Sequence, residues 1–195
     1  MLIKQTPKFL IGVDEVGRGP IAGPAAVCAL LWKDREFDPP PHIKDSKQLS
    51  PQKREEWFEQ IKQWEKEGRV SFAVSYVCAE TIDKMGISHS IHKAVRSSIR
   101  RLEVDPAQVH ILLDGGLYAP EEFYHQETLI KGDEREPVIA LASIIAKVHR
   151  DRLMERMADQ YPGYGFDMHK GYGTNEHYKA LRKLGPSPLH RLSFI

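Results

Sequence analysis

Short apolar runs bounded by turn residues recur along this chain. Residues 8–14 (KFLIGVD) and 24–32 (PAAVCALLW) are two such runs, and the segment GRGPIAG between them is typical of a tight connection. The run at 70–77 (VSFAVSYV) alternates as a half-buried strand does, and VHILLD at 109–114 is almost wholly apolar. A less regular run covers about 127–131. The pattern predicts strands over these segments.

Helical periodicity separates the predicted strands. The stretch from Ser50 to Glu67 opens with Ser-Pro, carries large apolar residues three and four positions apart, and ends before a glycine, which predicts a capped amphipathic helix. Further helices are predicted over 88–104, over about 137–159, and over a short segment near 175–184. Because strands and helices interleave without repeats or low-complexity linkers, we expect one α/β domain over residues 1–195, with a mixed sheet flanked by helices.

Composition adds limits to this picture. Apolar residues make up 41% and charged residues 28% of the chain, as in ordinary globular proteins. No run approaches the roughly 18 apolar residues of a membrane span, and two acidic residues follow the start too closely for a signal peptide. We therefore expect a cytoplasmic protein without a membrane partner. Cys28 and Cys78 lie in apolar stretches and are expected to be two reduced core thiols rather than a disulfide or a metal site.

The net charge of +1 conceals a basic C-terminal quarter. Nine Lys or Arg and five Asp or Glu lie between Lys147 and Ile195, together with several tyrosines. Such a segment can line a groove for a polyanion, because Lys and Arg contact phosphates while aromatic rings stack on sugars or bases. A solvated helical surface has the same composition, and charge alone favours that interpretation.

Acidic residues lie at the ends of several predicted strands: Asp14 and Glu15, Asp114 and Asp133. Each alone is typical of a turn or a helix cap. Together they match the oxygen ligands that Mg²⁺ or Mn²⁺ prefers, and two such ions can promote phosphodiester hydrolysis. Asp14 and Glu15 are adjacent, so on a regular strand they point to opposite faces. Both can serve one site only if the strand ends or distorts there.

Two further segments suggest phosphate contacts. Gly17 and Gly19 flank Arg18, so the backbone can approach a ligand closely and the guanidinium can bind a phosphate with two hydrogen bonds. Lys47, shortly before the first predicted helix, is either a phosphate contact or a solvated residue beside a turn. The chain has no GxxxxGK[ST] motif, so nucleotide binding at a P-loop has no support.

Ordered motifs along nearly the whole chain resemble bacterial ribonuclease HII, the type 2 ribonuclease H. They are GVDEVGRGPIAGP (12–24), KDSKQLS (44–50), LLDG (112–115), KGDEREPVIALASIIAKVHRD (131–151), YGFDMHKGYGT (164–174) and HRLSF (190–194). The resemblance implies a ribonuclease H-like fold and an endonuclease that cleaves the RNA strand of RNA/DNA hybrids. It also implies cleavage on the 5′ side of single ribonucleotides in duplex DNA, leaving 5′-phosphate and 3′-hydroxyl ends.

The resemblance also implies roles for individual residues. Asp14, Glu15, Asp114 and Asp133 correspond to the family's metal-binding carboxylates, which bind Mg²⁺ or Mn²⁺, with two ions when substrate is bound. Gly17, Arg18 and Gly19 correspond to the loop that recognises the ribose 2′-hydroxyl, the group that distinguishes RNA from DNA. Lys47 corresponds to a phosphate-contacting lysine, and Tyr172 to the tyrosine that stacks on the sugar at the RNA-DNA junction.

Two other functions are compatible with the same motifs. One is a ribonuclease HIII-like hybrid nuclease, although the intact GRG loop favours the type HII enzyme. The other is a hybrid-binding protein without catalysis, against which the complete carboxylate set argues. We expect a monomer that acts on hybrids and on duplex DNA with embedded ribonucleotides, without an obligate protein partner. The helical segment at about 160–195 is expected to complete the substrate groove.

Overall fold

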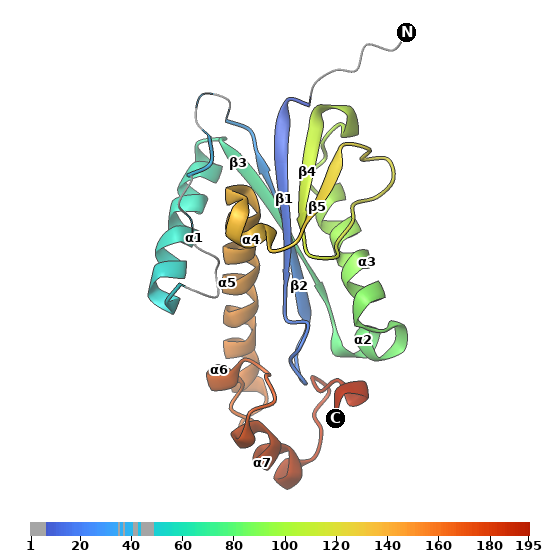
Figure 1. Cartoon of the computed structure of the whole chain (residues 1–195). Helices are drawn as coiled ribbons and strands as arrows, with labels where there is room; N and C mark the ends of the chain where they lie inside the picture. Colours follow the sequence, from blue (N-terminus) through green and yellow to red (C-terminus); the bar gives the residue numbers. More distant parts are fainter. Residues whose placement is uncertain (1–6, 35, 37, 41–42, 44–48) are drawn as a thin grey trace.

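A five-stranded mixed sheet forms the centre of the molecule (Figure 1). The computed structural model describes residues 7–34, 36, 38–40, 43 and 49–195. Its strands are β1 (Phe9–Val16), β2 (Ala25–Trp32), β3 (Val70–Val77), β4 (Val109–Asp114) and β5 (Gln126–Leu129), in the spatial order β3-β2-β1-β4-β5. β1 pairs antiparallel with β2 and parallel with β4, so β1 is the central strand. The predicted mixed sheet is confirmed.

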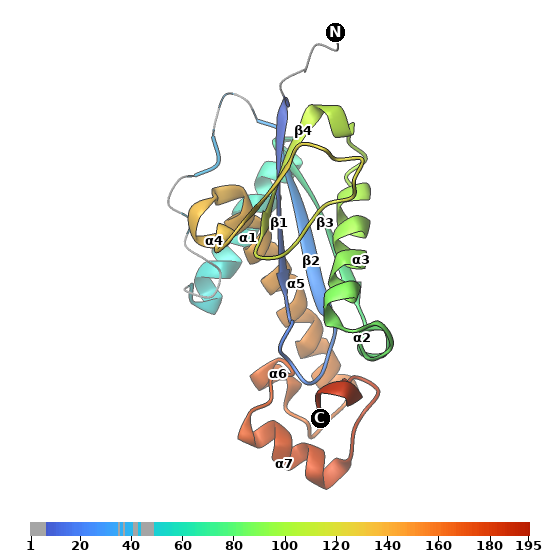
Figure 2. The ribbon, with the colours of Figure 1, turned by 45° about the vertical axis from the view of Figure 1, so that its right-hand side comes forward.

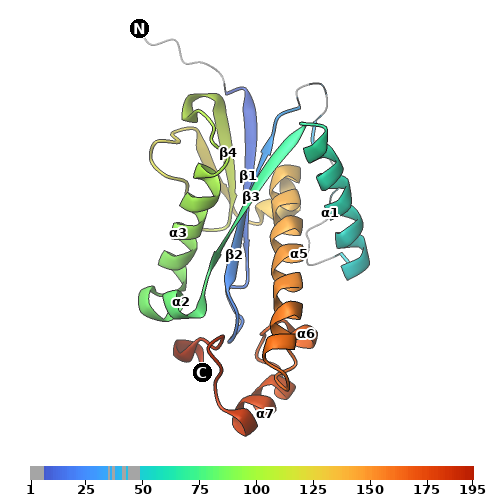
Figure 3. The same ribbon diagram turned by 180° about the vertical axis from the view of Figure 1, so that it is seen from behind.

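Helices cover both faces of this sheet (Figures 1 and 3). They are α1 (Pro51–Lys66), α2 (Ala79–Met85), α3 (Ile87–Arg100), α4 (Gly132–Arg135), α5 (Pro137–Gln160), α6 (Phe166–His169) and α7 (Asn175–Leu184), with single 3-10 turns at Pro106–Gln108 and Leu192–Phe194. α1 and α5 pack on one face, where they share an apolar core with alternate residues of the strands. α2 and α3 pack on the other face around a second core. Cys28 is buried as expected, but Cys78 is exposed at the start of α2, so the prediction of a core thiol there is wrong.

The long predicted elements agree with the structure to within a few residues. α1 begins after Ser50, whose hydroxyl accepts a hydrogen bond from the Lys53 N–H at 3.2 Å, as a helix cap does. The helix expected over 88–104 ends earlier, at Arg100, and the short helix α2 precedes it. Gly86, with φ +76°, separates the two helices. The short helices α2, α4 and α6 have too few turns to show a periodicity in the sequence.

The central strand β1 divides its side chains between the two cores. Ile11 and Val13 face the α3 side, whereas Leu10 and Val16 face the α5 side. Gly12 shares the α5 face, and a Cβ there would lie 2.2 Å from the Val138 carbonyl oxygen. The absent side chain therefore lets the first turn of α5 rest on β1. Asp14, two residues further on, has the same parity and faces the same helix.

The C-terminal segment after α5 folds against the connection between β1 and β2 (Figure 2). Ala22 and His190 form an antiparallel β-bridge, and the Arg191 N–H donates to the Ile21 carbonyl at 2.8 Å. A third apolar cluster joins this segment to α5 through Ala22, Met154, Tyr164 and Phe166. The rings of Tyr164 and Phe166 are stacked in it with their centroids 5.3 Å apart. Within the described ranges, no helix combines the length and apolar character that a membrane crossing requires.

Candidate active site

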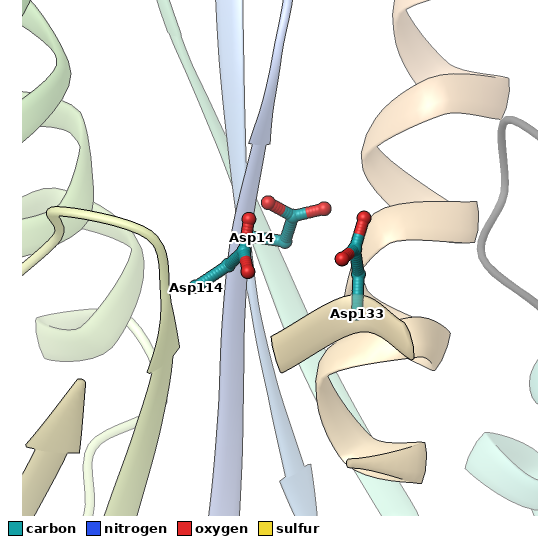
Figure 4. A group of neighbouring side chains, drawn as sticks. All are labelled: Asp14, Asp114 and Asp133. Carbon is teal, nitrogen blue, oxygen red and sulfur yellow. The ribbon is translucent and has the colours of Figure 1, made fainter. Parts of the chain in front are cut away.

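Three carboxylates from distant parts of the chain meet beside the C-terminal ends of β1 and β4. Asp14 comes from β1, Asp114 from the last position of β4, and Asp133 from α4 (Figure 4). One carboxylate oxygen of each lies within 4.8 Å of the others. In the sequence, 100 residues separate the first two and 19 separate the last two. The predicted convergence of these three acidic residues is therefore present in the fold.

Backbone geometry holds this carboxylate cluster together. Val13 of β1 pairs in parallel register with Leu113 of β4, so the next residue on each strand is an aspartate. The Asp114 carboxylate accepts a hydrogen bond of 2.7 Å from the Gly132 N–H, which anchors the start of α4. A Cβ at Gly132 would lie 2.6 Å from Ile139 Cδ1, so a larger residue there would displace the end of the Ile139 side chain. α4 then carries Asp133 to the cluster.

Two of the three carboxylates in the cluster are almost fully buried, and Asp114 is partly exposed. Asp14 is 2% exposed and Asp133 is 4% exposed. Burial raises the pKa of Asp14 well above its usual value, and the nearby charges of Glu15 and Asp114 raise it further, while a hydrogen bond with Ser143 partly opposes them. Buried carboxylates are costly unless they are paired or bind a metal. Oxygen-only donors at this spacing fit a hard divalent cation such as Mg²⁺ or Mn²⁺.

Glu15 lies beside the carboxylate cluster but is not one of its three members. β1 remains paired with β2 through Val16, so the strand neither ends nor distorts at Asp14 and Glu15. The Glu15 side chain consequently leaves from the opposite face of the strand, where its Oε1 lies 3.3 Å from Arg18 Nη1. Its Oε2 is buried and has no hydrogen-bond partner among the described residues. Burial raises the pKa of Glu15, the charge of Arg18 partly opposes this shift, and the charge of Asp114 adds to it.

Two buried arginines hold the loop that contains Gly17, Arg18 and Gly19. Arg191 donates to the carbonyl oxygens of Gly17 at 2.7 Å and Arg18 at 2.9 Å. Arg150 donates from Nε to the Pro24 carbonyl at 2.9 Å. Both side chains are fully buried. Sequence reasoning did not single out either arginine, because nothing local distinguishes a buried arginine that binds carbonyl groups from a solvated one.

The two glycines of this loop are needed for different reasons. Gly17 has φ +88°, and a Cβ there would lie 2.4 Å from Arg150 Nε. Glycine is therefore required at position 17 by the backbone conformation and by the packing of Arg150. Gly19 has no positive φ, and an added Cβ would meet nothing within 4 Å. The free protein therefore shows no packing reason for glycine at position 19, which leaves space for a ligand beside the backbone.

Tyr172 is attached to the same loop from the C-terminal side. The Gly171 carbonyl accepts hydrogen bonds from the Ile21 and Ala22 N–H groups at 2.9 and 3.2 Å. The Tyr172 ring is 41% exposed and lies 5.8 Å from the Arg150 guanidinium. The ring is therefore positioned by the loop that carries Arg18, with one part open to solvent. Lys47, the remaining predicted phosphate contact, lies outside the described residues.

Comparisons with known proteins agree on one family. The family model for ribonuclease HII matches residues 11–195. The ribonuclease HII of Lachnoclostridium phytofermentans is 43% identical over 96% of this chain and 70% of that protein. The ribonuclease HII of Caldicellulosiruptor bescii is 39% identical over 100% of this chain and 90% of that protein.

Solved structures have the same fold. The ribonuclease HII in a complex with PCNA from Archaeoglobus fulgidus has a TM-score of 0.78 at 25% identity, over 96% of this chain and 95% of that one. A Bst-RNase HIII structure in complex with Mn²⁺ has a TM-score of 0.68 at 23% identity, over 97% of this chain and 68% of that one. At 23% identity, the similarity to the Bst-RNase HIII structure shows a shared fold and nothing more.

Proposed function

Because this chain belongs to the ribonuclease HII family, a family of metal-dependent endoribonucleases that act on RNA/DNA hybrids, we propose that Asp14, Asp114 and Asp133 are its metal ligands. The meeting of these three carboxylates within 4.8 Å carries the proposal. We propose Glu15 as the fourth ligand although it leaves β1 from the opposite face, because its carboxylate is near enough to Asp114 for that charge to raise its pKa, and its buried Oε2 lacks a hydrogen-bond partner in the described structure. Two ions, Mg²⁺ or Mn²⁺, occupy the site with substrate.

The chain's own groups orient the carboxylates for this task. The Glu15 N–H donates to Asp14 Oδ1 at 2.7 Å, and the Gly132 N–H fixes Asp114. Bound divalent ions supply charge neutralisation at the phosphate and activation of the attacking water. Arg18, half exposed and hydrogen-bonded to Glu15 and Ser88 at 3.3 Å each, adds a cation that can exchange these contacts for a phosphate. Cleavage leaves a 5′-phosphate and a 3′-hydroxyl.

Recognition of the ribonucleotide falls to the loop of Gly17, Arg18 and Gly19 together with Tyr172. The open space beside Gly19 lets a ribose approach the backbone, whose polar groups can bond the 2′-hydroxyl. The half-exposed Tyr172 ring stacks on the neighbouring sugar. This loop and Tyr172 need only one 2′-hydroxyl for recognition. We therefore propose cleavage on the 5′ side of single ribonucleotides embedded in DNA. Lys47 contributes a phosphate contact in this scheme.

A defined-substrate assay tests the proposal. The protein is incubated with duplex DNA bearing one ribonucleotide, and with a continuous RNA/DNA hybrid, in Mg²⁺, Mn²⁺ or EDTA. We expect metal-dependent cleavage of both, with the embedded ribonucleotide cut on its 5′ side. Cleavage of the hybrid alone favours the ribonuclease HIII-like alternative. Binding of both without cleavage under any metal favours a non-catalytic hybrid-binding protein.

The proposed function also concerns the location of the enzyme, its oligomeric state and its partners. We propose that the enzyme acts in the cytoplasm. We also propose that it works as a monomer, because this chain alone brings the three carboxylates together. Its partners are then RNA/DNA hybrids and duplex DNA with embedded ribonucleotides, with no obligate protein partner. Light scattering of the free enzyme and of its substrate complex measures the stoichiometry. A dimer in both states would contradict this part of the proposal.

A further inference from the structure

A cavity lies beside α3, the helix whose Ser88 hydroxyl accepts a hydrogen bond from Arg18. It has a volume of 470 Å³ and is lined by residues of α3 and of the segment that follows β4. We call it the α3 pocket. Its lining is His89, His92, Lys93, Arg96, Tyr118, Ala119, Pro120 and Glu121. Four of these eight side chains are basic or imidazole groups, and one is acidic.

The cations of the α3 pocket lack the ion pairs that their neighbours form. Lys93 and Arg96 are exposed, and neither forms an ion pair within the described part of the chain. By contrast, Lys84 pairs with Glu80 at 2.6 Å and Arg100 pairs with Glu122 at 2.8 Å, and both lie close by on α2 and α3. Unpaired cations that gather at one cavity create a local positive potential, which favours an anionic ligand.

An aromatic surface accompanies these cations. Tyr118 is 59% exposed, and its ring stacks on that of His92 with centroids 3.7 Å apart and planes inclined by 27°. The His92 Nδ1 is buried and has no hydrogen-bond partner among the described residues. Aromatic faces between basic side chains are typical of surfaces that track a nucleic-acid strand.

Two connections join the α3 pocket to the candidate active site. Arg18 lies 3.3 Å from Glu15 through Nη1, and its Nη2 donates to the Ser88 hydroxyl at 3.3 Å, so this side chain connects Glu15 to the first turn of α3, next to His89 of the pocket. Tyr118 follows Asp114 by four residues, through a turn in which the Leu117 N–H donates to the Asp114 carbonyl at 3.2 Å. From Ser88 to Arg96 the helix rises roughly 12 Å. That span covers about three phosphates of one strand, at roughly 3.4 Å each along the duplex axis.

We propose that the α3 pocket binds the sugar-phosphate backbone of the substrate duplex on one flank of the cleavage position. Lys93 and Arg96 contact phosphates that lie several nucleotides beyond the one near Arg18. Tyr118 packs against the nucleic-acid strand between these phosphates and the one near Arg18. This proposal rests on the proposed function, because a duplex must occupy the active site for its flank to reach the pocket. The pocket then adds affinity without touching the scissile bond.

The test is binding of a Lys93→Ala, Arg96→Ala double variant in EDTA, where no cleavage occurs. The substrate is a duplex with one ribonucleotide, shortened stepwise from either end. We expect the parent to lose affinity when one particular flank is shortened, and the double variant to be insensitive to that flank. On the longest duplex the variant should bind roughly tenfold more weakly, and the slope of log affinity against log salt should fall by about 2 for two lost phosphate contacts.

The matched control is Lys84→Ala, Arg100→Ala, which removes two nearby cations that already have carboxylate partners. It should bind like the parent at every length. Melting curves check that both variants fold. Equal salt slopes and equal length dependence in the parent and the Lys93, Arg96 variant would overturn the proposal, even if the parent cleaves normally. Failure of the proposed function has a separate signature, which is absence of metal-dependent cleavage by the parent.

Discussion

The imidazoles of His177 and His190 face each other, with their Nε2 atoms 3.1 Å apart. The Ser187 N–H donates to His190 Nδ1 at 2.9 Å, so that nitrogen is an acceptor and the proton of a neutral His190 is on Nε2. His190 therefore donates to His177 Nε2. His177 then carries its proton on Nδ1 and donates to the Tyr172 carbonyl at 2.9 Å. This hydrogen-bond chain supports Tyr172 and requires both imidazoles to be neutral.

The neutral chain predicts acid sensitivity. Burial lowers the pKa of His177 from 6.5 to about 4. Since an unfolded histidine takes up its proton near pH 6.5, the unfolded state binds more protons between about pH 6.5 and 4. The contribution of His177 to stability is therefore complete above about pH 7 and is lost as pH falls through that window. We expect the free energy of unfolding to drop by about 2 kcal/mol from this group.

Urea unfolding at pH 7, 6, 5 and 4.5 measures this drop. His177→Asn keeps a polar side chain without titrating, so its stability should be lower at pH 7 but change less with pH. His89→Asn removes an exposed histidine of α3 and should follow the parent. Parallel curves for the parent and His177→Asn would show that another group causes the acid sensitivity.

Substitution of Gly17 is predicted to lower stability, whereas substitution of Gly19 is predicted to lower cleavage. Gly17→Ala places a Cβ against Arg150 at a positive φ, so we expect a loss of stability of about 2 kcal/mol and a displaced loop. Gly19→Ala meets no neighbour, so stability should remain within about 0.5 kcal/mol of the parent. Cleavage at a single ribonucleotide should nevertheless fall at least about tenfold, because the methyl group occupies space that the ribose needs. Thermal melting and initial rates separate the two effects.

Repulsion within the carboxylate cluster should lower the stability of the metal-free protein, although the same charges are needed for cleavage. Asp14→Asn removes one buried charge that is repelled by Glu15 and Asp114, while its amide oxygen still accepts from the Glu15 N–H. Without metal the variant should be more stable than the parent by about 1 kcal/mol. Its cleavage rate should fall below about 1% of the parent rate.

Melting in EDTA and in Mg²⁺ measures both sides of this trade. Mg²⁺ should raise the melting temperature of the parent more than that of Asp14→Asn. Asp167→Asn, which changes an exposed aspartate of α6, is the matched control and should behave as the parent does. A variant that is destabilised in EDTA would show that Asp14 is stabilising without metal and would contradict the repulsion argument.

The sequence predicted those features that depend on local patterns. Short apolar runs located β1 and β4, and the strand ends then pointed to Asp14 and Asp114. Asp133 was found by the same reasoning, although the short helix that carries it was not. The face that Glu15 occupies follows from strand parity, and the structure shows that β1 stays regular through Val16.

The remaining features depend on contacts between distant segments. Arg150 and Arg191 hold the loop at 17–24 through carbonyl groups that lie 126 to 174 residues away in the chain. No periodicity encodes such a contact, because each arginine alone looks like a solvated basic residue. The same holds for the imidazole chain from Ser187 to Tyr172, whose direction depends on which backbone N–H reaches His190 Nδ1.

Tyr172 offers a direct test of how a single ribonucleotide is recognised. Its ring is half exposed, and its hydroxyl forms no hydrogen bond within the described structure, so the ring itself is the group that contacts a sugar. Tyr172→Phe should therefore retain cleavage, whereas Tyr172→Ala should lose at least about tenfold on a single embedded ribonucleotide through lost stacking. Its loss on a continuous hybrid should be smaller, because several ribonucleotides present alternative positions.

Initial rates on the two substrates give this ratio, and melting curves report any change in folding. Tyr178→Ala removes the similarly exposed ring of α7, at 37% exposure, and is the matched control. It should leave the ratio of the two rates unchanged. Because Gly171 attaches this segment to the loop at 17–24, a folding defect in Tyr172→Ala would lower both rates together. An equal fall on both substrates would assign the ring a packing role and remove it from recognition of the junction.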